Sequence, residues 1–139
     1  MTRAATEALI RRYYDRFNAG DVEGMLVLLT DDVVHDISQG GREVGRDAFA
    51  KFLGHMNGAY REHAQSPTVM TNEDGSRAAA ELQLDGTYVA TDGSLPPANG
   101  QRYVLTVGAF FEVRDGRIAR VSNHYNMQDW LRQVRGGAA

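Results

Sequence analysis

The chain contains no cysteine. This absence excludes disulfide bonds, zinc sites built from thiolates and a cysteine nucleophile. A chain without cysteine also suits a reducing compartment, so we expect a cytoplasmic location.

The sequence also lacks a long hydrophobic run. Its longest strongly apolar stretch, residues 25–29, is far shorter than the roughly 18 residues that a membrane span requires. Near the N-terminus, Arg11 and Arg12 precede any apolar stretch long enough for a signal peptide. We therefore expect neither membrane insertion nor secretion.

An excess of positive charge is missing as well. Fifteen basic residues stand against eighteen acidic residues, which gives a formal net charge of −3, and the arginines are scattered along the chain. A mildly acidic protein has no general attraction to phosphate backbones or to anionic lipid. We expect no nucleic-acid partner and no membrane partner.

What is present is the composition of an ordinary globular domain, with 42% apolar and 24% charged residues. A length of 139 residues fits a single domain that covers the whole chain. In the first half, apolar residues recur at the three- and four-residue spacing of amphipathic helices, in residues 9–17, 22–29 and 49–60. The sequence therefore predicts three N-terminal helices.

Strands dominate the second half. Alternating and β-branched residues predict a short strand over residues 33–37 and further strands over residues 68–71, 77–91, 103–114 and 117–127. Asp-Gly pairs between them supply the positive φ that tight turns need. We predict an α+β fold: a cone-shaped barrel whose three N-terminal helices pack on a strongly curved antiparallel sheet and enclose an apolar cavity.

Four segments resemble a known superfamily: RYYDRFNAGD (residues 12–21), LLTDDVV (28–34), GRDAF (45–49) and FEVRDGRI (111–118). They are similar to nuclear-transport-factor-2-like proteins, which include ketosteroid isomerases, polyketide cyclases and limonene epoxide hydrolases. QGGRE and YRE, at residues 39–43 and 60–62, resemble the SnoaL-like, ketosteroid-isomerase-related members. The resemblance implies the cone-shaped fold and a homodimer that pairs through the convex faces of two sheets.

The resemblance also implies roles for particular residues. The tyrosine that stabilises an oxyanion in ketosteroid isomerases follows an arginine in the first helix, as Tyr13 does here. The general-base aspartate of those enzymes aligns with Ile37 without a gap, and with Asp36 after a gap of one residue. Their second acid, and the last-strand acid of polyketide cyclases, have no counterpart, because those positions hold Gly108 or Ala109 and Asn126.

The strand over residues 33–37 carries the most suggestive pair of polar residues. His35 and Asp36 are neighbours, and adjacent strand residues point to opposite faces, so one of the two is expected to face the cavity. Burial raises the pKa of a carboxylate, and an imidazole titrates near neutrality, so either residue can take a proton. We expect Asp36 or His35 to be the base and the Tyr13 hydroxyl to stabilise the developing charge, with Tyr14 as the alternative donor.

Five further residues are expected to contact a substrate. The strands place Tyr88, Asn123 and Tyr125 toward the cavity, and the apolar face of the third helix adds Phe52 and Met56. Their apolar bulk favours a hydrophobic small molecule.

Three other residues remain alternatives. The alternation of the last strand turns His124 outward, and a reversed alternation would make it the main rival of His35. Glu81 or Asp85, on the polar face of the strand over residues 77–91, would supply an acid if that face lined the cone.

The sequence shows no local pattern for a cofactor. The four histidines have no metal-site spacing, and the glycines form no phosphate-binding loop, so we expect no metal and no nucleotide cofactor. Chemistry would then rest on carboxylate, imidazole and phenol groups. We predict cofactor-independent acid–base catalysis on a hydrophobic small molecule: isomerisation, cyclisation, proton transfer or water addition. The alternative is a non-catalytic binding or interaction domain, which a cone filled by Met56, Phe52 and Trp130 would favour.

Overall fold

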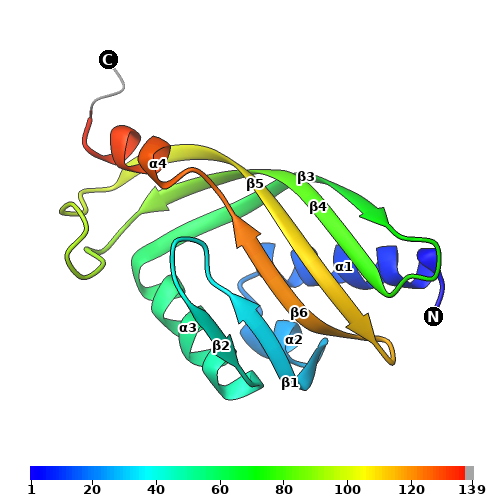
Figure 1. The fold of residues 1–139 in the computed structure, drawn as a ribbon. Helices are drawn as coiled ribbons and strands as arrows, with labels where there is room; N and C mark the ends of the chain where they lie inside the picture. The colour runs from blue at the N-terminus through cyan, green and yellow to red at the C-terminus, as the bar shows by residue number, and fades with distance from the viewer. Residues whose placement is uncertain (137–139) are drawn as a thin grey trace.

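The structure, a computed structural model, describes residues 1–136 (Figure 1). The three N-terminal helices and the strands follow the predicted order, with a short edge strand added before the third helix. The elements are α1 (Arg3–Asn18), α2 (Val22–Leu26), β1 (Leu29–Asp36), β2 (Arg42–Val44), α3 (Arg46–Ala59), β3 (Tyr60–Thr71), β4 (Arg77–Tyr88), β5 (Gln101–Arg114), β6 (Arg117–His124) and α4 (Met127–Val134).

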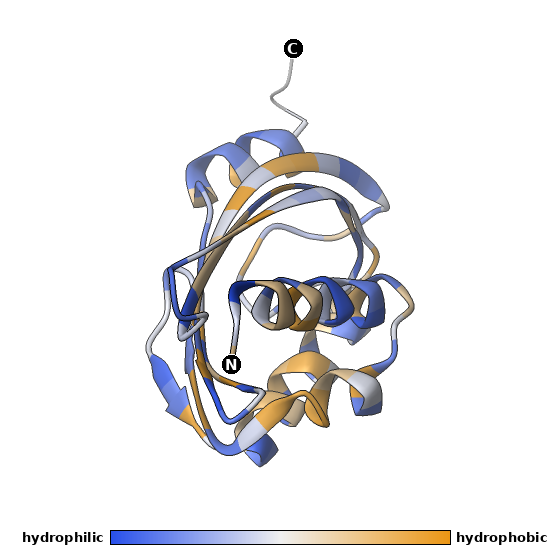
Figure 2. Ribbon diagram, turned by 90° about the vertical axis from the view of Figure 1, so that its right-hand side faces the viewer, coloured by the Kyte–Doolittle hydropathy of each residue, from blue (hydrophilic) through white to orange (hydrophobic). Residues whose placement is uncertain are grey.

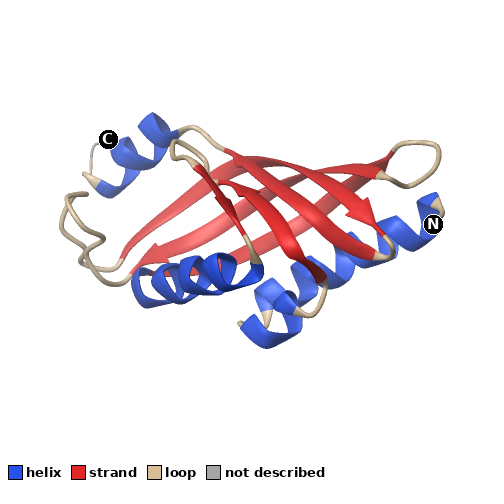
Figure 3. Ribbon diagram, turned by 60° about the horizontal axis from the view of Figure 1, so that its bottom comes forward, coloured by secondary structure: helices blue, strands red, loops and turns tan. Residues whose placement is uncertain are grey.

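All six strands form one curled sheet in the order β2-β1-β6-β5-β4-β3 (Figure 3). The sheet does not close, because β2 and β3 remain as its two edges. Four of the neighbouring pairs are antiparallel, as expected, whereas β1 and β6 run parallel. A parallel pair needs a long crossover connection, and here all the elements from β2 to β5 lie between the two strands.

The helices α1 and α3 lie on the concave side of the sheet, which wraps around them (Figure 2). Their apolar faces meet the inner face of the strands, where Ile10, Phe49, Phe111 and Val121 are almost completely buried. This arrangement confirms the predicted α+β fold with N-terminal helices packed on a strongly curved sheet. None of the helices within residues 1–136 is long and apolar enough to cross a membrane.

The strand β3 differs most from the prediction. It starts at Tyr60, directly after α3, whereas the sequence pattern extended the helix to Tyr60 and began a strand at residue 68. The Tyr60 backbone is extended, with φ −133° and ψ 148°, although its side chain still points to the core as a helical one would. A register shift between Gln65 and Thr68 bends the strand at Ser66, where φ is 44°.

The other boundaries of helices and strands differ less from the prediction. The strands expected over residues 77–91 and 117–127 end at Tyr88 and His124, and the edge strand β2 was not predicted. The Asp115-Gly116 pair forms the tight turn between β5 and β6 as expected, with φ of 52° and 77°.

Candidate functional site

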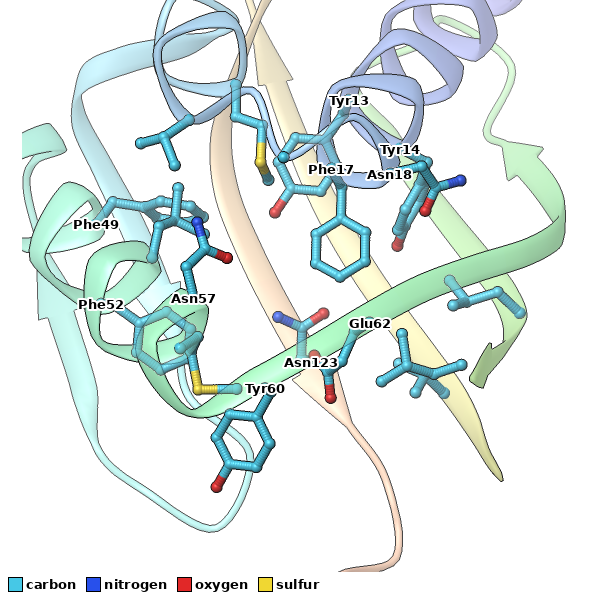
Figure 4. Close-up of a pocket in the computed structure, with 18 of the residues that line it drawn as sticks. Tyr13, Tyr14, Phe17, Asn18, Phe49, Phe52, Asn57, Tyr60, Glu62 and Asn123 are labelled. Carbon is cyan, nitrogen blue, oxygen red and sulfur yellow. The ribbon is translucent and has the colours of Figure 1, made fainter. Parts of the chain in front are cut away.

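A pocket of about 360 Å³ lies between α1, α3 and the concave face of the sheet (Figure 4). This volume is in the range of small-molecule sites. Most of the wall is apolar and aromatic, with contributions from Phe17, Phe49, Phe52, Leu82, Leu84 and Val107. A few polar side chains interrupt it, among them Tyr13, His35, Glu62 and Asn123.

Tyr13 reaches the pocket from α1. Its ring packs edge-on against Tyr14 and Phe111, with centroids 5.3 and 5.7 Å apart, and its hydroxyl points into the pocket (Figure 4). Within residues 1–136 the hydroxyl has no hydrogen-bond partner. Burial raises the pKa of Tyr13 well above its ordinary value, so the phenol is a protonated donor at neutral pH.

His35 enters the pocket from β1. Its ring lies 4.6 Å from the rings of both Phe49 and Phe52, and only 2% of the residue is exposed. The Nδ1 atom is buried and has no hydrogen-bond partner in the part of the chain that the structure describes. Burial lowers the pKa of His35, against the opposing charges of Glu43 and Asp36, so the imidazole is uncharged at neutral pH.

Asp36 lies outside the pocket, which corrects the expectation that it could act as a base there. As the neighbour of His35 on a strand, it points to the opposite face, where Arg42 Nε donates a hydrogen bond to its Oδ1 at 2.6 Å. The Ser122 hydroxyl donates to Oδ2, and Arg120 lies 3.7 Å away. The bonds from Arg42 and Ser122 lower the pKa of Asp36 to about 2, so it stays ionised and accepts protons poorly near neutrality.

Glu62 is the acidic residue that the structure places in the pocket and that the sequence reasoning missed. The Tyr103 hydroxyl donates a hydrogen bond of 2.5 Å to Oε2 of Glu62. Burial raises the pKa of Glu62, and the bond from Tyr103 only partly opposes this effect. The signal that could have found it is the alternation of Tyr60, Glu62 and Ala64 on one face of β3, which becomes visible once the strand is started at residue 60.

Tyr103 reaches Glu62 because the strand between them leaves room. Glu62 of β3 pairs with Gly86 of β4, and Gly86 pairs with Tyr103 of β5. A Cβ atom at position 86 would lie closer than 3.0 Å to three atoms of the Tyr103 side chain. The tyrosine ring therefore crosses the glycine to place its hydroxyl on the carboxylate.

Four of the five expected substrate contacts line the pocket, namely Phe52, Met56, Asn123 and Tyr125. Tyr88 does not, which corrects that expectation. Its ring lies between Tyr60 and Trp130, at centroid distances of 5.4 and 5.1 Å. Its hydroxyl donates to the Pro96 carbonyl and accepts from the Asp92 amide, so it holds the loop over residues 89–100.

The three alternative residues lie on the convex face. His124 is exposed beside the ring of Phe110, as the alternation predicted. Glu81 is exposed, and Asp85 accepts hydrogen bonds of 2.8 Å from Gln65 and Gln83. In residues 1–136, no three His, Asp or Glu side chains gather in a way that could hold a metal ion.

Comparisons with known proteins point to one family. The family model described as "SnoaL-like domain" matches residues 10–121. A search among curated proteins finds no match.

Solved structures give the same result. A candidate polyketide cyclase from Xanthomonas campestris is 51% identical, covers 96% of this chain and 99% of its own, and superposes with a TM-score of 0.94. Another from Pseudomonas putida is 54% identical, with 96% and 98% covered and a TM-score of 0.91. A candidate ketosteroid isomerase from Kribbella flavida is 28% identical, with 91% and 82% covered and a TM-score of 0.65.

Proposed function

The chain belongs to the SnoaL-like domain family, and from this premise we propose that it is an enzyme that carries out cofactor-independent acid–base chemistry on a hydrophobic small molecule. The reaction class is isomerisation, cyclisation, proton transfer or water addition. The substrate binds in the pocket between α1, α3 and the sheet.

The observation that carries the proposal is a pair of uncharged polar groups with unused hydrogen-bonding capacity in an apolar pocket. Tyr13 presents a protonated phenol, and His35 presents a neutral imidazole. In such a poorly solvated site, a fixed donor stabilises developing negative charge more strongly than water does. A carbonyl or epoxide oxygen that gains charge during the reaction is the group that these side chains suit.

The open pocket also favours an enzyme over a non-catalytic domain. Trp130 does not fill it but packs behind Tyr88 and Tyr103. The relatives described as candidate polyketide cyclases and as a candidate ketosteroid isomerase support a catalytic role.

The proposal is tested by hydrogen–deuterium exchange at the α-carbon of 2-tetralone, a hydrophobic enolisable ketone, followed by NMR in deuterated buffer. Hydrolysis of styrene oxide is measured in parallel. We expect the protein to accelerate at least one reaction, and Tyr13→Phe to lower that rate on the order of 10²–10³-fold, as loss of an oxyanion donor does. The exposed Glu81→Gln serves as the control with an unchanged rate. No acceleration of either reaction would refute the enzymatic role.

We propose in addition that the chain forms a homodimer through the convex face. Val104 and Phe110 of β5 are large apolar side chains that are 50% and 49% exposed on this face. Pairing of two sheets would remove this surface from water.

A further inference from the structure

We propose that Glu62 is the catalytic base of this site and that Tyr103 is the residue that positions it. The inference rests on the proposed function, because it names the group that takes the substrate's proton. It also defines the substrate class as a hydrophobic carbonyl compound with an acidic C–H bond beside the carbonyl.

The geometry of the Glu62 carboxylate suits a general base. Oε2 of Glu62 is fixed by the Tyr103 hydroxyl at 2.5 Å, while Oε1 has no hydrogen-bond partner within residues 1–136. Glu62 lines the pocket, and its side chain points into the same space as that of Asn123 (Figure 4). One oxygen is thus held in place and the other is available to a substrate, which is the arrangement of a general base with an orienting partner.

In residues 1–136, no cation pairs with the Glu62 carboxylate. Only the neutral Tyr103 hydroxyl counteracts the effect of burial on the pKa of Glu62 in the described part of the chain. The adjacent Arg61 also lines the pocket, but its guanidinium donates to the backbone carbonyls of Asn57 and Tyr60. A poorly solvated, unpaired carboxylate holds a proton more readily, which brings its pKa closer to the pH at which it must work.

Tyr103, the hydrogen-bond partner of Glu62, is itself buried and closely packed. The Tyr103 ring is 2% exposed, crosses Gly86 and packs 6.0 Å from the Trp130 ring. Burial and the nearby Glu62 raise the pKa of Tyr103, so its hydroxyl stays protonated and can donate to the carboxylate. Tyr103 does not line the pocket, so its contribution is to orient Glu62.

The proton balance is simple. The α C–H bond of the ketone breaks, its proton moves to Oε1 of Glu62, and the electron pair forms the carbon–carbon double bond of an enolate. The carbonyl oxygen takes up the negative charge and accepts a hydrogen bond from a pocket donor such as Tyr13. Glu62 then returns a proton to carbon, so no oxidant or reductant is needed.

The test uses exchange of 2-tetralone in deuterated buffer with the variants Glu62→Gln and Tyr103→Phe. Loss of the general base should reduce the exchange rate on the order of 10²–10⁴-fold in Glu62→Gln. Glu81→Gln, which changes an exposed glutamate in the same way, should keep the wild-type rate. Circular dichroism of Glu62→Gln checks that the fold is retained.

Tyr103→Phe tests whether Tyr103 orients Glu62 through its hydroxyl or only packs its ring in the core. It removes the hydrogen bond that favours the charged form of Glu62, so the acidic limb of the pH–rate profile should move to higher pH. A profile that does not move would overturn the role of Tyr103, because a packing role alone leaves that limb in place.

The remaining outcomes distinguish the two proposals. Wild-type exchange that persists in a folded Glu62→Gln variant overturns the assignment of Glu62 but leaves the enzymatic role standing. A wild-type protein that accelerates neither ketone exchange nor epoxide hydrolysis overturns the enzymatic role and the base together.

Discussion

Gly86→Ala is the perturbation that tests most directly how the pocket is built. The new methyl group would lie closer than 3.0 Å to Cζ, Cε2 and the hydroxyl oxygen of Tyr103. Real Cβ atoms do not approach other atoms so closely, so the ring must move. Because Tyr103 is 2% exposed, it has no free space into which to move without disturbing its neighbours.

Three effects determine how much Gly86→Ala changes the free energy of unfolding. Overpacking costs about 1–3 kcal/mol, and loss of the hydrogen bond to the Glu62 carboxylate adds about 1.5–3 kcal/mol. Replacing a strand glycine by alanine returns about 0.5–1 kcal/mol through the entropy of the unfolded chain. We expect Gly86→Ala to lower the free energy of unfolding by about 1.5–5.5 kcal/mol, measured by urea denaturation at pH 7.

The chain offers a matched control in Gly108→Ala. Gly108 lies inside β5 of the same sheet, a Cβ atom added there would have no other atom within 4 Å, and the position should tolerate alanine without loss of stability. In a Tyr103→Ala background the tyrosine ring is absent, so Gly86→Ala should not lower the free energy of unfolding there. An equal cost of Gly86→Ala in both backgrounds, or a neutral effect in the wild type, would refute the crossing of Tyr103 over Gly86.

Four further predictions concern other regions. Gly54→Ala, in α3 with open space around the added methyl group, should raise stability in urea by about 1 kcal/mol. Asp36→Asn should lower the free energy of unfolding by about 1–2 kcal/mol at pH 7. Because the pKa of Asp36 is lowered to about 2, the wild type loses this stability as the pH falls from 4 to 2, and the difference between the two proteins should vanish. The stability of Glu62→Gln relative to the wild type should instead be higher at pH 7 than at pH 4, because the raised pKa of Glu62 means that the wild type loses stability as the pH rises. Sedimentation should show a dimer that becomes a monomer in Val104→Glu/Phe110→Glu, and a wild-type monomer at high concentration would refute the convex interface.

Local patterns were sufficient to predict the framework of the fold. Leu9, Ile10 and Tyr13 recur at helical spacing and are buried on one face of α1. The Asp115-Gly116 pair needs positive φ and forms the turn between β5 and β6. Each of these signals depends on residues within a few positions of one another, which is why it can be seen in a single sequence.

The start of β3 could not be predicted in the same way. Tyr60 continues the apolar periodicity of α3, and the nearest glycine, Gly58, lies inside the helix and does not mark its end. The helix ends there because the chain must pair with β4, where Tyr60 lies opposite Tyr88. Tertiary pairing overrides the local pattern at this point, and the error concealed the alternation that brings Glu62 to the inner face.

The candidate site depended on such long-range pairing even more strongly. Adjacent positions on a strand point to opposite faces, so the sequence correctly required that only one of His35 and Asp36 face the cavity. It could not say which, because that depends on the parallel pairing of β1 with β6, which sets His35 beside the buried Val121 and Asp36 beside Ser122.

Asp36 and Glu62 show why residue type alone does not identify a base. Both are carboxylates, but Asp36 receives hydrogen bonds from Arg42 and Ser122, and its pKa falls to about 2. Glu62 receives one from the neutral Tyr103 in a buried position, and its pKa rises. A carboxylate that is stabilised by arginine gives up its affinity for protons, whereas one that burial leaves poorly stabilised keeps it. Environments that separate the pKa values of two like groups in this way assign the structural role to Asp36 and the proton transfer to Glu62.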